Sequence, residues 1–367
     1  MKYLNRQFSV VFASVLFFYG PSASAFEFSL FGSAAVNSGD DSNENFALGE
    51  LELIAEHKLS DKTSIVADML FMSEQDEIHT ELERFSINRT ITSMFEVGIG
   101  RYMQPMGLWN HNFSHGSLAQ HTATRPLLID GESHNNSIVP SHLIGVLFRG
   151  ENESFSYQLA IANADGMDTS LAAQGLGPVS VHSMNNQSPS NEITTVLRLT
   201  YRVSDQLELG LLAGNHNYVE IGEGTTLVEP SEVVFEQTFG ALDFYYNGTS
   251  FYLFGEFYSL DYKDNENLTG VGISANPDSY SGEYYYLQAG YRITDKLTFV
   301  TRYESLDFDD AATFFYAQNY VPQTRSILGF NYAIEPSNSI RFQIAEIDPD
   351  IGTGDSIATL QWFFYLL

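Results

Sequence analysis

Five of the nine histidines of the chain lie between positions 111 and 142. His111 and His115 are four residues apart, so both imidazoles would share one face of a short helix. Asp130 and Glu132 could add carboxylate ligands for a transition metal. The chain has no cysteine and shows no known ligand spacing, so a hydrogen-bonded polar loop is the competing interpretation. The sequence therefore predicts no cofactor and no metal site, with His111 and His115 as weak candidates for metal binding.

Serines beside histidines are the second pattern that could carry chemistry. Ser114 and Ser141 each directly precede a histidine, and Ser117 lies close to the first pair. Nucleophilic catalysis needs a hydroxyl near a base that a third group orients, whereas neighbours on a strand point to opposite faces. No hydrolase motif surrounds these pairs. We therefore predict that the protein is not an enzyme.

Alternating apolar and polar residues dominate the rest of the chain. Seven times, two runs of about ten to thirteen residues are joined by a short turn that contains Asp, Asn, Gly, Ser or Pro. The joints lie at 58–62, 89–93, 148–152, 202–206, 246–249, 292–296 and 334–338. The segments between these hairpins are longer, more acidic and uneven in length. Short turns on one rim and long loops on the other are typical of an outer-membrane β-barrel.

The alternating runs predict sixteen strands. Their expected spans are 27–37, 47–58, 63–73, 80–90, 94–103, 142–150, 153–163, 192–203, 206–218, 233–246, 249–261, 282–293, 296–307, 324–334, 339–347 and 355–367. An even number lets both termini lie on the periplasmic side, and each strand is long enough for a tilted crossing. The predicted fold class is therefore all-β: a transmembrane antiparallel up-and-down β-barrel of about 16 strands, wide enough for an aqueous lumen.

The N-terminus has the features of an export signal. Lys2 and Arg6 precede an apolar run at 8–19, and the small-residue site 23–25 follows. A transmembrane helix is the competing interpretation, but the run is shorter than the roughly 20 residues that a crossing requires. We expect residues 1–25 to be a cleavable signal peptide and residues 26–367 to form the barrel in a bacterial outer membrane.

Composition supports a barrel and limits the partners. Aromatic residues make up 14% of the chain, which suits two interfacial girdles, although a soluble all-β core is the alternative. Removing residues 1–25 takes away two basic residues and moves the formal charge from −29 to −31. Nucleic acid is excluded as a partner at that charge.

Outer-membrane lipid and lipopolysaccharide are the expected surroundings of the barrel. The acidic patches 39–44 and 261–266 either bind divalent cations that bridge lipopolysaccharide or are plain solvated loops.

The period of two along the strands separates the two faces of the wall. Charged residues must face inward, because at the bilayer midplane Arg or Lys on the lipid face costs about 2–4 kcal/mol. The charged residues that this rule sends to the lumen as pore candidates are Glu52, Asp68, Arg198, Arg202, Asp243, Glu256, Arg292, Arg302 and Glu304. Both signs of charge indicate a water-filled pore with a transverse field, although some of these residues could form salt bridges at the rims.

Residues 104–141 form the longest connection between the expected strands. Structureless segments of this length in a compact fold are usually functional. The segment is the third outer loop in chain order and mixes apolar with polar residues, so it should pack against the barrel. We expect it to fold into the lumen, with an outer lid as the alternative. The constriction candidates in and beside it are Arg101, Trp109, His111, His115, Arg125, Asp130 and Glu132.

The stretch GIGRYMQPMGLWN, then Arg125-Pro126, then VPSHLIGVLFRG resembles porins of the phosphate-selective and related outer-membrane families. The resemblance covers about 50 residues closely and the rest only as a strand pattern. It implies a sixteen-stranded, often trimeric, passive channel with an inward third loop. Phosphate selectivity is not implied, because only Arg101, Arg125 and Arg149 lie in or beside this segment.

These observations predict a porin for passive diffusion of small hydrophilic solutes or ions, with a bias toward cations. The alternative is a plugged or receptor-type barrel whose third loop binds a ligand or a metal. If the loop histidines contribute, we expect a pH response near 6.5. The last strand ends in Leu366-Leu367 after several aromatic residues, and barrel-insertion machinery should still recognise it. Both of its faces are apolar, which a homotrimer interface would explain.

Overall fold

The computed structural model describes residues 26–39, 45–74, 77–113, 121–129, 139–168, 180–182, 191–220, 233–264, 279–309, 322–350 and 352–366. These residues form eighteen strands and one short helix. In order they are β1 (Glu27–Gly39), β2 (Asn45–Ser60), β3 (Thr63–Glu74), β4 (Glu77–Thr92), β5 (Phe95–Met103), α2 (Gly107–Asn112), β6 (His142–Glu151), β7 (Phe155–Asn163), β8 (Asp165–Asp168), β9 (Ser180–His182), β10 (Ile193–Ser204), β11 (Leu207–Glu220), β12 (Val233–Asn247), β13 (Phe251–Asp264), β14 (Ser279–Arg292), β15 (Leu297–Phe308), β16 (Gln323–Glu335), β17 (Asn338–Pro349) and β18 (Asp355–Leu366).

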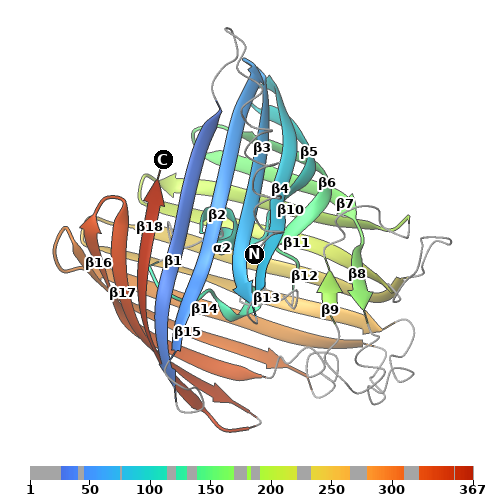
Figure 1. Cartoon of the computed structure of the whole chain (residues 1–367). Helices are drawn as coiled ribbons and strands as arrows, with labels where there is room; N and C mark the ends of the chain where they lie inside the picture. The colour runs from blue at the N-terminus through green and yellow to red at the C-terminus, as the bar shows by residue number, and fades with distance from the viewer. Residues whose placement is uncertain are drawn as a thin grey trace.

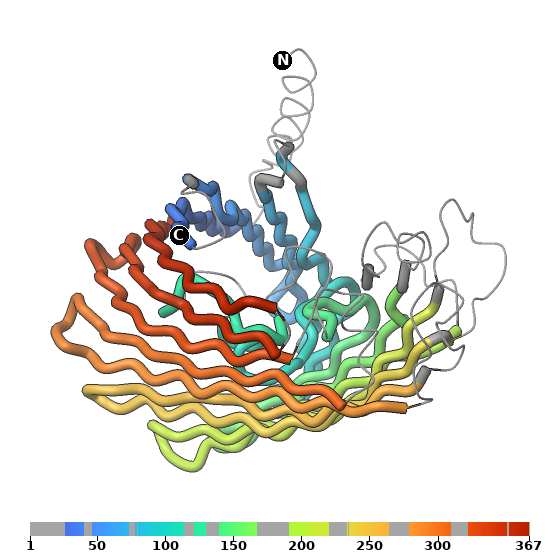
Figure 2. Tube along the Cα trace, turned by 90° about the horizontal axis from the view of Figure 1, so that it is seen from below, coloured from blue at the N-terminus to red at the C-terminus, as the bar shows by residue number. Residues whose placement is uncertain are grey.

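Sixteen of these strands close into one antiparallel barrel, as the sequence predicted (Figure 1). Neighbours in the chain pair with each other, β10 pairs with β7, and β1 closes the ring by pairing with both β2 and β18. Leu30, for example, lies opposite Leu53 on one side and Leu366 on the other. Figure 2 shows the ring from below, with the two ends of the strand order side by side.

Two short strands were not predicted. β8 and β9 lie in the connection between β7 and β10 and pair with each other. β8 also runs parallel to the end of β11, where Tyr218 lies opposite Asp165. This hairpin extends the wall at the end of the barrel opposite the short turns. Among the described residues, no helix is both long and apolar enough to span a membrane.

Side chains of the turn residues fix the hairpins. Asn152 Oδ1 accepts the backbone N–H groups of Ser154 and Phe155 at 2.9 and 2.8 Å. Thr294 Oγ1 does the same for two backbone N–H groups in the turn between β14 and β15. Such local hydrogen bonds let a short polar sequence reverse the chain, which explains why these turns were predictable.

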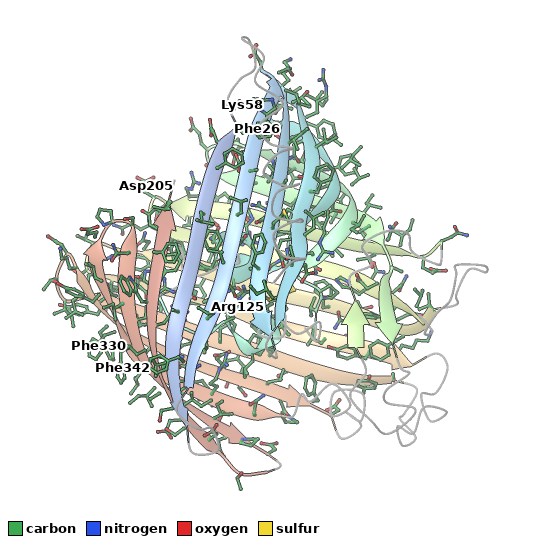
Figure 3. The ribbon with its side chains drawn as sticks, viewed as in Figure 1. Phe26, Lys58, Arg125, Asp205, Phe330 and Phe342 are labelled. Atoms are coloured by element: carbon green, nitrogen blue, oxygen red, sulfur yellow. The ribbon has the colours of Figure 1, made fainter. Side chains whose placement is uncertain are left out.

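The two faces of the wall alternate as the period of two requires. On β14, Tyr285 and Leu287 are exposed on the outer face, whereas Tyr284 and Tyr286 are buried on the inner face. Exposed aromatic residues also lie opposite each other across strands, as Phe330 and Phe342 do on the outer side of β16 and β17 (Figure 3). The exposed apolar face is the surface that a bilayer would cover.

The alternation also assigns the faces of the last strand, which the sequence left open. Trp362, Phe364 and Leu366 are 59%, 38% and 60% exposed, so they form the outer face. Phe363 is buried, and the guanidinium of Arg341 lies 4.9 Å from the centre of its ring. The inner aromatic residue is therefore part of a cation–π contact within the barrel.

Candidate functional site

The third-loop segment, residues 104–141, begins and ends at a polar clasp. The backbone N–H of Gln104 donates to the carbonyl oxygen of Ser141 at 2.8 Å. Asn110 Nδ2 donates to the carbonyl oxygens of both Gln104 and Ser141, at 2.8 and 3.0 Å. All three residues are buried. The side chain of Asn110 thus holds together the two ends of a segment whose described parts are 104–113, 121–129 and 139–141.

Glu256 of β13 is the first point at which the wall binds this segment. Its carboxylate accepts the backbone N–H of Trp109 at 2.6 Å and the hydroxyls of Tyr258 and Tyr286 at 2.5 and 2.6 Å. Gly107 begins α2 with φ of 53°, and a Cβ there would lie 1.9 Å from Glu256 Oε2. The close approach of helix and carboxylate therefore requires glycine at this position.

Aromatic packing surrounds that hydrogen-bond cluster. The ring of Trp109 lies 5.2 Å from that of Phe113 and 6.1 Å from those of Phe254 and Tyr286. The Arg302 guanidinium lies 5.5 Å from the Trp109 ring. Because the indole and its neighbours are buried, α2 gains both apolar burial and a cation–π contact against the inner face of the wall.

Glu304 of β15 is the second point of attachment. Its carboxylate accepts the backbone N–H of Leu127 at 2.7 Å and the hydroxyl of Tyr284 at 2.8 Å. Arg302 Nε and Arg325 Nε also donate to it, at 2.8 and 2.9 Å. This carboxylate is fully buried, and two guanidinium groups compensate its charge.

The arginines beside Glu304 extend the attachment along residues 121–129. Arg302 donates to the hydroxyl of Thr122 at 3.0 Å and to the backbone oxygen of Arg125 at 2.9 Å. Arg125, which is labelled in Figure 3, in turn donates to Glu50 of β2 at 2.8 Å. The segment is thereby tied to β2 as well as to β15, so it contacts strands that lie far apart in sequence.

Several of the predicted lumen charges occur in oppositely charged pairs, either within one strand, between neighbouring strands or across one intervening strand. Arg198 Nη2 donates to both carboxylate oxygens of Asp243, at 3.0 and 3.1 Å. Asp68, which lies beside the buried Glu52, accepts from Arg84 at 3.1 Å. Arg101 likewise reaches a carboxylate on β4 at 3.0 Å. Charges paired at this distance cancel much of each other's field, so the wall produces less field than its number of charges suggests.

Other predicted site residues lie away from this cluster. Arg202 donates to the backbone oxygen of Glu153, and Arg292 donates to the backbone oxygens of Gly248 and Thr249, so both stabilise short turns. His111 contacts Gln158 through Nδ1 at 3.2 Å. The remaining predicted residues fall outside the described part of the chain, namely His115, Asp130 and Glu132. Within the described part, no three His, Cys, Asp or Glu residues are arranged to hold a metal ion.

One expectation about the serine–histidine pairs is wrong. Ser141 Oγ and His142 Nδ1 lie 3.0 Å apart, although the strand geometry predicted opposite faces. The reason is that Ser141 lies in a bend before β6, which begins at His142. His142 Nε2 also lies 2.7 Å from Glu83. All three side chains are buried next to the clasp, so a structural role accounts for their contacts.

A second buried histidine contact was missed by sequence reasoning. His216 of β11 lies 3.2 Å from Asp165 through Nδ1 and 3.0 Å from Gln104 Nε2 through Nε2. It connects the start of the third-loop segment to β8. Asp165 gave no signal, because β8 is too short for a visible alternation. Glu50 could have been predicted as a lumen residue, since it lies two positions from Glu52 on β2 and therefore faces the same side.

No protein-family model and no curated protein matches the chain. Solved structures do match. OmpT, an outer membrane protein of Vibrio cholerae in a trimer form, has a TM-score of 0.61 and 9% identity, over 94% of this chain and 100% of that chain. The anion-selective porin from Comamonas acidovorans has a TM-score of 0.61 and 10% identity, over 93% and 99%. The chain has the fold of the bacterial outer-membrane porins.

A further solved structure has the same fold. The outer membrane channel DcaP of Acinetobacter baumannii has a TM-score of 0.61 and 11% identity, over 95% of this chain and 99% of that one. At these identities the likeness concerns the fold alone. The porin fold accounts for the closed barrel, while the choice of solute must be argued from this chain's own residues.

Proposed function

We propose that the protein is an outer-membrane porin that passes small hydrophilic solutes or ions by passive diffusion, with a bias toward cations. In this proposal the third-loop segment folds into the lumen and narrows the channel. The main support for this proposal is a pair of hydrogen bonds, from the Trp109 N–H to Glu256 and from the Leu127 N–H to Glu304. A loop held at two points against the inner face of a barrel restricts the cross-section without any covalent closure.

The proposed cation bias rests on the distribution of charge. The formal charge of the chain is −29, and acidic residues are frequent in the connections between hairpins, as at Asp40, Asp41 and Glu44. Acids at a channel mouth raise the local concentration of cations. Screening over about 8 Å at physiological salt and the pairing of wall charges both weaken this effect, so we expect a modest selectivity.

The proposal includes the route to the membrane and the surroundings of the protein. Residues 1–25 would direct export and be removed, and barrel-insertion machinery would recognise the aromatic end of β18. Lipid and lipopolysaccharide would cover the exposed apolar face. A homotrimer is supported by the trimer form recorded for the Vibrio cholerae neighbour. No catalytic role is proposed, because Ser141 is part of the clasp and His142 is buried next to it between Ser141 and Glu83.

A plugged or receptor-type barrel is the second candidate. The observation that favours it is the density of the attachment, since Trp109, Leu127 and Leu128 are all almost fully buried. A plug would have to leave for solute to pass, whereas a constriction stays in place.

A salt-gradient experiment separates the proposed porin from the receptor-type barrel. The mature protein is refolded and inserted in planar bilayers, and the reversal potential is measured. Stepwise current with a cation-biased reversal potential supports the porin. A sealed barrel would overturn it and favour the receptor.

A further inference from the structure

A polar cavity of about 420 Å³ lies beside α2 at the ends of β4, β5, β6 and β7 that carry the short turns. Its volume is within the range of small-molecule sites, roughly 300–1,000 Å³. The polar side chains that line it include Thr90, Glu96, His111, Arg149, Ser156 and Gln158. None of the pore candidates predicted from the sequence lies in this cavity except His111, so it is distinct from the attachment of the third-loop segment.

The charges in this cavity largely compensate each other. Arg149 Nε donates to Glu96 Oε1 at 2.6 Å, and Thr90 donates to Glu96 Oε2 at 3.0 Å. Glu151 is a second, exposed carboxylate in the lining. A small anion would meet two carboxylates here, and a small cation would meet the Arg149 guanidinium. Neither kind of ion therefore finds a complementary site.

The histidine in this cavity presents a fixed hydrogen-bonding group. Gln158 Nε2 donates to His111 Nδ1 at 3.2 Å, which leaves His111 Nε2 as an N–H donor. Desolvation, together with the positive charges of Arg198 and Arg149, lowers the pKa of His111 to about 4. The imidazole is therefore neutral at pH 7. Serine, threonine and glutamine side chains supply further donors and acceptors around it.

We propose that this cavity binds a neutral polyhydroxylated solute of the saccharide class on its way through the channel. Each sugar hydroxyl both donates and accepts, which matches a lining that offers the His111 N–H, the Ser156 hydroxyl and the Gln158 amide oxygen together. Carboxylate and guanidinium groups bind hydroxyl pairs without requiring a charge on the solute. The inference deepens the proposed function and depends on it, because a solute bound here changes the conductance only if the barrel is an open channel.

The test uses the mature protein in planar bilayers with maltose as the probe and glycine as a zwitterionic comparison. Current noise and the fall in conductance are recorded against maltose concentration. We expect a saturable effect of maltose and none of glycine. Gln158→Leu removes the hydrogen bond that orients His111, and it should raise the half-saturating maltose concentration at least about tenfold, while ionic steps still occur.

A matched control makes the same change outside the cavity. Gln206 lies in the exposed turn between β10 and β11, and Gln206→Leu should leave the half-saturating maltose concentration unchanged. Ionic current without any saturable maltose effect, or a saturable effect of glycine instead, would overturn the saccharide site and leave the porin intact. A wild-type protein without ionic current would instead overturn the proposed function itself.

Discussion

The backbone N–H of Trp109 donates to the carboxylate of Glu256 at 2.6 Å, although the two residues are 147 positions apart in the chain. The same carboxylate accepts two tyrosine hydroxyls, so three donors depend on it. The third-loop segment therefore owes its position to a residue of β13 that no local pattern connects with it.

Replacing Glu256 by alanine should loosen the third-loop segment without unfolding the barrel. The change leaves the Trp109 N–H and the Tyr258 and Tyr286 hydroxyls without their acceptor, at about 1–3 kcal/mol for each buried group that stays unsatisfied. We expect faster cleavage within residues 104–141 in limited proteolysis and noisier single-channel current. Glu236→Ala is the control, because Glu236 forms an exposed ion pair with Lys263 at 3.3 Å, away from the third-loop segment. Equal cleavage of both variants would contradict the anchoring role.

Gly107→Ala should displace the start of α2. The residue has a φ of 53°, where an L side chain costs about 1–2 kcal/mol, and its new Cβ would lie 1.9 Å from Glu256 Oε2. The helix or the carboxylate must move, so the single-channel conductance should change. Gly240→Ala is a suitable comparison, since the nearest atom to a Cβ there is 3.9 Å away. An unaltered conductance in Gly107→Ala would show that this contact does not set the channel.

Acid should weaken the attachment of the third-loop segment. Desolvation and nearby arginines lower the pKa of His111 to about 4 and that of His121 to about 3. An unfolded or detached loop has histidines that take up protons near pH 6.5. The detached state therefore binds more protons between about pH 6.5 and 4, so the stability of the attachment is complete above this window and falls with falling pH.

Protease sensitivity of the loop as a function of pH measures this effect. We expect cleavage to increase as the pH falls from about 6.5 to 4, and the double variant His111→Gln/His121→Gln to flatten that dependence. The response that the sequence suggested near pH 6.5 should not arise from direct titration of these two residues in the attached loop. A sharp protonation of either imidazole at pH 6.5, followed by NMR, would disprove this account.

Removing the charge of Arg125 should increase the preference for cations. Arg125 lies 2.8 Å from Glu50, so Arg125→Gln reduces the positive charge beside that carboxylate. The reversal potential in a salt gradient should shift toward the cation equilibrium potential. Arg89→Gln, at an exposed position that donates to Thr63, should cause no shift. A shift of the same size in both variants would place the selectivity outside the third-loop segment.

The barrel could be predicted because its signals are local. Strand periodicity follows from backbone geometry, and turn residues such as Asn152 and Thr294 act on N–H groups two or three positions away. β8 and β9 were missed because four and three residues are too few to show an alternation.

The attachment of the third-loop segment could not be predicted in detail. The alternation along the strands predicted that Glu256 and Glu304 face the lumen. It could not show that their carboxylates accept backbone N–H groups 147 and 177 positions away. The same rule grouped Arg202 and Arg292 with the pore, whereas their position along the strand places them at turns. The alternation along a strand specifies which face of the wall a side chain occupies, whereas its role depends on tertiary contacts.

The most direct test of the central claim compares single-channel conductance of the mature protein with that of a variant lacking residues 108–135. The account predicts stable open steps for the intact protein and larger steps for the deletion, because a constriction has been removed from a channel that was already open. An intact protein that stays sealed and conducts only after the deletion would contradict it. The third-loop segment would then be a plug, and the barrel a receptor.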